Sequence, residues 1–322
     1  MKNNYLKGVL CCLIATVAWG CMFPVMTSAL LHLDPFNFTA MRYAIAGAGF
    51  TAILLFKEGT SALRLAGEKV FLAWFLGTCG FAGFGFLVFW GQKLAGPTGA
   101  LTASITMATM PLLGILVNWL VRGLRPLPWT LFFILLSFCG VALVITHGDI
   151  TAVLSHPENF NANLLILLGA LCWVVYTIGG SFFPTWSPYR YTTITTLLGL
   201  TSIFAINAVL LMTGYIQWPS PGQIISVTPH LFYMALVAGL IGVLCWNIGN
   251  KIITPVNGVL FMDVVPITAF TVSALTGVVP VPAQILGASI TAIALIMNNL
   301  YQRRKQIIIA KPTPTTITAE PG

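Results

Sequence analysis

Ten long apolar runs, separated by short polar breaks, constrain this chain more than any other feature. Each run is close to the ~20 residues that an α-helix needs to cross the hydrocarbon core of a membrane. The runs are continuously apolar rather than alternating, which argues against a membrane-spanning barrel of strands. We therefore expect an all-α integral membrane protein with ten transmembrane helices, near residues 9–31, 36–56, 71–92, 98–121, 129–147, 162–184, 190–213, 230–250, 256–277 and 283–301.

The composition agrees with this fold class. Only 7% of the residues are charged and 57% are hydrophobic, whereas a soluble domain carries about 25% charged residues. This excludes soluble enzymes, secreted scaffolds and disordered proteins. The seven cysteines all lie in apolar runs and form no C-x-x-C pair, and the four histidines have no second ligand at helical spacing. We therefore expect no metal site and no cofactor.

The lysines and arginines predict the orientation in the membrane. With the N-terminus inside, 13 of the 15 fall in inside segments, Lys93 alone falls outside, and Arg42 lies within the second run. Since positive charge accumulates on the cytoplasmic side, both termini should be cytoplasmic in a multi-pass protein of the cell inner membrane. The net charge of +8 is then explained by contact with anionic lipid, so no nucleic-acid partner is expected.

The chain also contains an internal duplication. The pattern G-[Q/N]-K-x-x-x-P begins at Gly91 and again at Gly249, 158 residues later. Pro111 matches Pro266 at an offset of 155, and Trp19 in the first run matches Trp173 in the sixth at an offset of 154. These offsets agree within a few residues, which indicates that the chain is a duplication of a five-helix unit.

Five is an odd number, so the second copy must enter the membrane from the opposite side, which makes the repeat inverted. The inversion also explains why Lys93 lies outside while its counterpart Lys251 lies inside. We expect a first repeat at 1–148, an extracytoplasmic linker at 149–161, a second repeat at 162–302 and a disordered cytoplasmic tail at 303–322.

No enzyme motif is present: the chain has no G-x-S-x-G, no H-E-x-x-H, no nucleotide-binding lysine loop and no pair of carboxylates at helical spacing. Movement of a small-molecule solute across the lipid bilayer is the function that remains. In proteins built from inverted repeats, the solute site lies near the midplane of the membrane, between the two repeats.

Aromatic side chains are the candidate lining of such a site. Trp19 and Phe23 share one face of the first run, and Trp173 and Tyr176 share one face of the sixth, which the inverted repeat makes equivalent. Phe86 and Trp90 stand four residues apart in the third run, and Trp246 with Asn247 occupies the matching depth of the eighth. The alternative interpretation of any one of them is plain packing or interfacial anchoring. The candidate substrate-binding residues are Trp19, Phe23, Phe86, Trp90, Trp173, Tyr176, Trp246, Asn247 and Asp263.

Arg42 and Asp263 are the ionisable residues that lie well inside runs. Each would cost about 2.5–3.5 kcal/mol at a helix centre, so neither should face lipid. For Arg42 we expect a structural role, by reaching the interface or binding a helix C-terminus. For Asp263 three roles stay open: a counter-charge for a substrate ammonium, a proton-coupling site, or a structural pair.

Short motifs along the chain carry a family resemblance, and their order and spacing resemble the drug/metabolite transporter superfamily, EamA type. The motifs are ATVAWG at 15–20, MRYAIA at 41–46, GALCW at 169–173, CWNIG at 245–249 and LFMDVVP at 260–266. The resemblance implies a secondary transporter that exports a small metabolite such as an amino acid by alternating access. Protons or a counter-solute are the expected coupling partners, and a monomer or weak dimer is the expected assembly.

Other functions stay open at this stage. A carrier for organic cations or larger metabolites would use Asp263 as its counter-charge. From a different class, an integral membrane enzyme or a lipid flippase would also fit a polytopic helical protein, although the chain has no paired catalytic groups.

Overall fold

The fold is that of a computed structural model, which describes residues 2–96, 99–123, 125–146, 157–253, 261–262, 264–275, 277 and 281–310. The first repeat contains α1 (Lys2–Ala29), α2 (Pro35–Glu58), η1 (Thr60–Leu63), α3 (Val70–Gly77), η2 (Thr78–Gly83), α4 (Phe84–Leu94), α5 (Gly99–Met107), α6 (Met110–Arg122) and α7 (Pro128–Thr146). The second contains α9 (Pro157–Gly179), η4 (Gly180–Phe182), α10 (Pro188–Met212), α11 (Pro221–Phe232), η5 (Tyr233–Ile241), α12 (Gly242–Ile253), α14 (Val264–Leu275) and α15 (Pro282–Ala310).

Each of the ten expected crossings contains a helix among the residues that the structure describes. Within the described residues, six helices are long and apolar enough to cross a membrane, and α5 with α6 forms a seventh span that is bent by 47°. Three shorter apolar helices account for the other expected crossings, and they lie in α7, α14 and α15. The protein is therefore an all-α membrane protein, as its hydropathy predicted.

Polar caps decide where several of these helices begin. The side chain of Asp34 accepts hydrogen bonds from the first free amides of α2, and Ser187 caps α10 in the same way. Ser220 and Gln223 form a reciprocal capping box at the start of α11. This box explains why the eighth crossing begins at Pro221 rather than near residue 230, where the apolar run begins.

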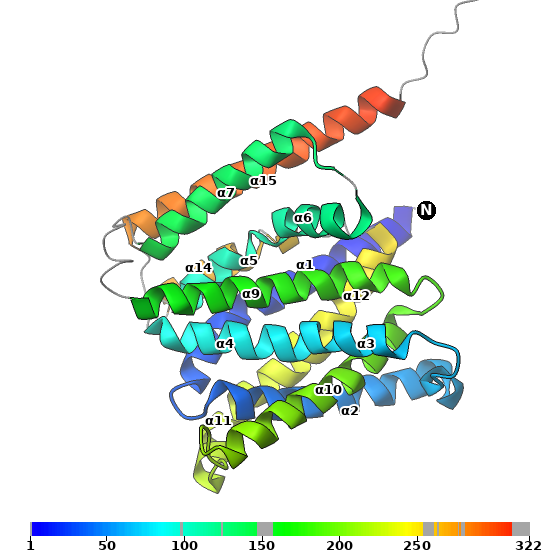
Figure 1. Cartoon of the computed structure of the whole chain (residues 1–322), viewed down its shortest axis with the longest axis vertical. Helices are drawn as coiled ribbons and strands as arrows, with labels where there is room; N and C mark the ends of the chain where they lie inside the picture. The colour runs from blue at the N-terminus through cyan, green and yellow to red at the C-terminus, as the bar shows by residue number, and fades with distance from the viewer. Residues whose placement is uncertain are drawn as a thin grey trace, which may run out of the picture.

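The chain turns alternately at the two ends of the bundle (Figure 1). The N-terminus and the C-terminal end of α15 lie at the same end, on the right of the view, together with the α2–α3 connection. We call this the Lys251 end and the opposite one the Asp34 end. An even number of crossings requires the two termini to share an end.

Two boundaries differ from expectation. The helix α15 continues through Ala310, so residues 303–310 are helical, whereas we expected disorder from residue 303; the Gln, Arg and Lys residues there are good helix formers. Of the expected linker at 149–161, residues 157–161 belong to α9. The rest of that linker and residues 311–322 lie outside the described residues.

The inverted duplication governs which helices pack together. Equivalent helices pair with each other: α2 with α10, α5 with α14, and α7 with α15. The first crossing of each repeat instead packs along the third crossing of the other, α1 against α12 and α9 against α4. Every major contact therefore has a counterpart, as two interlocked inverted halves require.

The glycines of the repeated motif stand at two of these contacts. A Cβ atom at Gly91 would lie 2.5 Å from the carbonyl oxygen of Ala162, at the crossing of α4 and α9. At Gly249 it would lie 2.5 Å from Cys12 Sγ, at the crossing of α12 and α1. The motif is therefore repeated because both contacts need a residue without a side chain.

Both third crossings also contain a π-helical segment. Thr78–Gly83 separates α3 from α4, and Tyr233–Ile241 separates α11 from α12. The 158-residue offset of the glycine motif moves 78–83 onto 236–241, inside the second segment. Single π turns are rare and recur at functional sites. Each such turn also rotates the residues after it relative to an uninterrupted α-helix.

Candidate functional site

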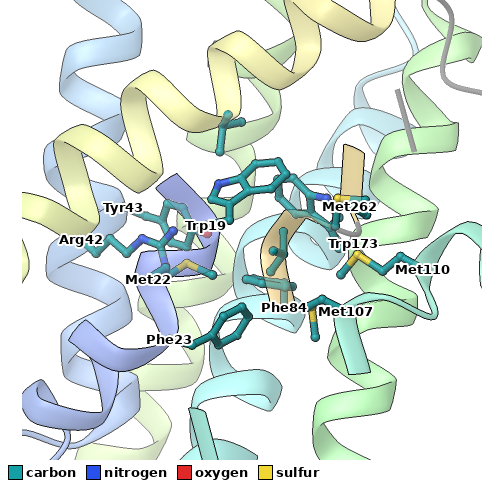
Figure 2. A pocket seen from close by; sticks show the side chains of 12 residues that line it. Trp19, Met22, Phe23, Arg42, Tyr43, Phe84, Met107, Met110, Trp173 and Met262 are labelled. Carbon is teal, nitrogen blue, oxygen red and sulfur yellow. The ribbon is translucent and has the colours of Figure 1, made fainter. Parts of the chain in front are cut away.

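A cavity lies deep between the two repeats (Figure 2). Its wall combines aromatic and methionine side chains with one arginine: Trp19, Met22, Phe23, Arg42, Tyr43, Phe84, Met107, Met110, Trp173, Val243, Met262 and Val265. The volume is about 20 Å³, little more than one water molecule needs. The side chains must therefore move apart before a solute can bind.

Two of the predicted tryptophans form one side of this cavity. The rings of Trp19 and Trp173 meet edge to face with centroids 5.3 Å apart. The indole N–H of Trp19 donates to the carbonyl oxygen of Ala238, in the second π segment, at 3.0 Å. The equivalent N–H of Trp173 has no hydrogen-bond partner among the described residues, although it is buried. The two symmetry mates thus differ in their bonding.

The asymmetry has a local cause. By the repeat, Gly80 in the first π segment is the equivalent of Ala238. At Gly80 a Cβ atom would lie only 2.6 Å from the ring of Tyr176, so that ring already covers this part of the segment. The N–H of Trp173 consequently has no counterpart of the bond that Trp19 makes.

Trp246 and Tyr176 belong to the same aromatic cluster but stand behind the cavity wall. Trp246 packs on Trp19 at 5.2 Å and Tyr176 packs on Trp173 at 5.1 Å. Neither is among the residues that line the cavity. They support the two lining tryptophans, whereas we expected all four rings to line one cavity.

Asn247 ties this cluster to the Lys251 end. Its amide nitrogen donates to Tyr176 Oη at 3.1 Å and to Thr192 Oγ1 at 2.7 Å. The hydroxyl of Tyr191 donates to the carbonyl oxygen of Tyr176 at 2.6 Å. These bonds join α9, α10 and α12 and close the cavity from this side.

An open pocket of about 320 Å³ lies beyond this network, at the Lys251 end. Asn247, Tyr191 and Lys251 contribute to its wall. Lys251 Nζ donates to the carbonyl oxygen of Pro184 at 3.1 Å, across its rim. The pocket and the central cavity are therefore separated by one layer of hydrogen-bonded side chains.

Phe86 and Trp90 do not reach the central cavity. They pack with Phe36 at 5.1 and 5.7 Å between ring centroids, and Tyr215 completes a second aromatic cluster toward the Asp34 end. Phe84 lines the cavity in their place. Phe86 and Trp90 were selected as a pair four residues apart at the depth of Trp246. Depth alone does not say which face of α4 meets the cavity.

Arg42 lies in the cavity wall and is 1% exposed. Its guanidinium lies 4.7 Å from the ring centre of Tyr43 and 5.5 Å from that of Phe89. Its Nε and Nη1 atoms have no hydrogen-bond partner in the part of the chain that the structure describes. Arg42 therefore neither reaches the interface nor binds a described helix C-terminus, contrary to our expectation. Its place as the one basic residue inside a run was the signal that could have revealed it.

The remaining predicted site residues divide into two groups. Phe23 lines the cavity as expected, while Asp263 lies outside the described residues. Sequence reasoning did not select the four methionines of the wall, Met22, Met107, Met110 and Met262. They come from three crossings, which only tertiary packing brings together.

Comparison with known proteins identifies the family. The family model of the EamA-like transporter family matches the chain twice, at residues 6–146 and 160–300. The chain belongs to this family. The transporter is 37% identical over 320 residues to "Uncharacterized transporter YrdR" of Bacillus subtilis (strain 168), covering 98% of this chain and 99% of that protein. It is 27% identical over 279 residues to "Uncharacterized transporter YyaM" of the same organism, covering 86% and 88%.

A solved crystal structure supports the fold of the transporter. It superposes with a TM-score of 0.64 at 22% identity and covers 95% of this chain and 99% of its own. The family resemblance expected from the local motifs is thus confirmed. The two family matches also give the duplication directly.

Proposed function

We propose that this transporter exports a small amphipathic metabolite, such as an amino acid, by alternating access of its two inverted repeats. The observation that carries the proposal is the central cavity, whose aromatic and thioether wall is built from both repeats. Such side chains bind the apolar part of a solute by stacking and area burial. Trp19 and Trp173 are the proposed stacking residues.

The barriers on either side of the cavity suit this mechanism. Toward the Lys251 end, the Asn247 network separates the cavity from the open pocket. Toward the Asp34 end, the second aromatic cluster packs around Phe36. Rocking one repeat against the other would open these layers in turn, with the π segments as the points of bending.

Binding to the purified protein tests the proposal. A panel of amino acids, other metabolites and organic cations is screened by thermal shift, since a ligand of the folded state raises its apparent stability. Hits are then followed by counterflow into liposomes. Trp19→Ala and Trp173→Ala should weaken binding by about thirtyfold, as for other central aromatic contacts. Trp218→Ala, at a side chain that is 81% exposed, is the matched control. Unchanged binding in both cavity variants would make these rings packing residues and refute the assignment.

The orientation is part of the proposal: inner membrane, both termini cytoplasmic. The segment between the two repeats carries no Lys or Arg, which favours an outside position. A single cysteine at Ser155, in a cysteine-free background, should react with an impermeant reagent on intact cells. Labelling only after permeabilisation would show that the proposed orientation is inverted.

Substitution of Asp263 distinguishes its three open roles, and a structural role predicts that Asp263→Asn folds poorly. If it couples transport to protons, Asp263→Asn should keep binding and exchange but lose accumulation driven by a pH gradient. If it is a counter-charge, the same change should lower affinity for cationic and zwitterionic solutes at every pH. We propose a monomer or weak dimer as the working assembly, which light scattering in detergent can measure.

A further inference from the structure

Among the described residues that line the central cavity, the polar groups have one sign. Arg42 is the one of these twelve that carries a charge, and none of the twelve is a carboxylate. Three of their donor atoms, Arg42 Nε, Arg42 Nη1 and Trp173 Nε1, have no partner in the described part of the chain. Figure 2 shows the Arg42 side chain entering from α2 with its guanidinium beside Met22, while Trp173 stands on the other side of the cavity.

A buried guanidinium without an acceptor is costly. The free-energy cost of moving a charge out of water is offset only when hydrogen bonds and an opposite charge replace the lost solvation. The rings of Tyr43 and Phe89 supply cation–π contact, worth about 2 kcal/mol when desolvated, but they leave the N–H groups unsatisfied. Arg42 also makes no ion pair with a described residue; the one described pair joins Arg190 to Glu68, at the Lys251 end.

The unsatisfied N–H of Trp173 is a second, independent observation. Its symmetry mate Trp19 has a carbonyl partner, so the described residues provide an acceptor for one indole and none for the other. Trp173 and Arg42 both line the cavity, so a solute bound there could supply an acceptor to each of them. A carboxylate is the smallest common group of solutes that accepts from several donors and carries the charge opposite to arginine.

We propose that Arg42 is the anion-recognition residue of the transporter, binding the carboxylate of the solute, with the Trp173 N–H as an additional donor. This rests on the proposed function and narrows it: the substrates are carboxylate-bearing amphipaths, acids or zwitterions, and not organic cations. The tryptophan rings hold the apolar part, and the guanidinium decides which solutes bind.

The test compares matched solutes on the purified transporter. Methionine, leucine, phenylalanine and tryptophan are each paired with their carboxamide and their decarboxylated amine, and the three affinities are measured by thermal shift. The acids should bind about thirtyfold or more tightly than the amides and amines, the range found when one partner of a buried charge pair is lost. Amines that bind as tightly as the acids overturn the proposal.

Substitution locates the effect. Arg42→Gln should reduce the acid-to-amide affinity ratio to about one, and Arg42→Lys should leave it intermediate because the ammonium keeps the charge but not the planar fork. Lys93→Gln removes the same charge from an exposed position and should leave the ratio unchanged. An acid-to-amide affinity ratio that is unchanged in Arg42→Gln overturns the assignment. The ratio measured on the parent protein tests the proposal even if the Arg42 variants do not fold.

Further outcomes distinguish this proposal from a structural pair of Arg42 with Asp263 and from failure of the proposed function. If Arg42→Gln loses acid binding but Arg42→Gln with Asp263→Asn regains it, Arg42 serves as the partner of Asp263, and the anion site is refuted. If no acid, amide or amine binds the parent, or if Trp19→Ala and Trp173→Ala bind like the parent, the proposed function itself fails. Solutes that depend on the tryptophans but not on Arg42 refute the anion site alone.

Discussion

The different bonding of Trp19 and Trp173 makes a prediction that needs no knowledge of the solute. Replacing either residue by phenylalanine removes the indole N–H and part of the ring, and both side chains are nearly buried, at 6% and 4% exposure. The loss of ring area is similar in the two variants. The difference between their stabilities therefore isolates the N–H group.

The structure sets the magnitude. Trp19→Phe breaks the bond to Ala238 and leaves a carbonyl of a fully buried residue without its donor. The net cost is about 1–3 kcal/mol beyond the lost area. Trp173→Phe instead removes a buried donor that has no partner among the described residues, so loss of this N–H relieves about 1–3 kcal/mol of desolvation. Trp19→Phe should thus be less stable than Trp173→Phe by at least about 2 kcal/mol.

Thermal unfolding in detergent measures this difference. For a protein of this size 2 kcal/mol corresponds to an unfolding temperature roughly 3 °C or more lower for Trp19→Phe. Intrinsic fluorescence would itself be changed by the substitutions, so loss of the monodisperse size-exclusion peak after heating is the better readout. Equal unfolding temperatures, or a less stable Trp173→Phe, would refute the bonding difference.

Two other predictions concern the contacts between the repeats. Gly91→Ala should destabilise the protein by about 1–3 kcal/mol, because the new Cβ would meet the backbone oxygen of Ala162 at 2.5 Å. The control in the same heating assay is Gly222→Ala, whose new Cβ would meet nothing within 4 Å. Equal effects of the two substitutions would contradict the close contact. The thiols of Cys79 and Cys172 contact each other across the repeats. In a variant that keeps only these two cysteines, catalysed oxidation should cross-link α9 to η2 and stop transport until a reductant is added. Transport that continues after complete cross-linking would show that these helices do not separate.

The sequence alone predicted the crossings and their duplication. Ten apolar runs were enough because the hydrophobic requirement of a membrane acts on each segment separately. The repeated glycine motif located the equivalent helices, and the tertiary structure explains it through the close contacts at Gly91 and Gly249. The start of α11 at Pro221 was missed because a capping box, and not hydropathy, begins that helix.

The candidate site was predictable only in part. Trp19, Phe23 and Trp173 were selected from helical faces and line the cavity, because α1 and α9 run through it without a π segment. Phe86 was selected by its depth in the third crossing, but it packs on Phe36 and does not line the cavity, because depth along a helix does not say which face meets the cavity.

The bonding within the site was decided by tertiary structure alone. The N–H of Trp19 meets the carbonyl oxygen of Ala238 in the opposite repeat. At the equivalent Gly80, the ring of Tyr176, from the same helix as Trp173, occupies the contact. The sequence shows neither contact, because both depend on how α9 and α1 pack against the other repeat. Arg42 was visible in the sequence as a charge within an apolar run, but its position in the cavity wall depends on how six crossings pack around it. Hydropathy acts within a segment, whereas burial, pairing and cavity shape belong to contacts between segments far apart in the chain.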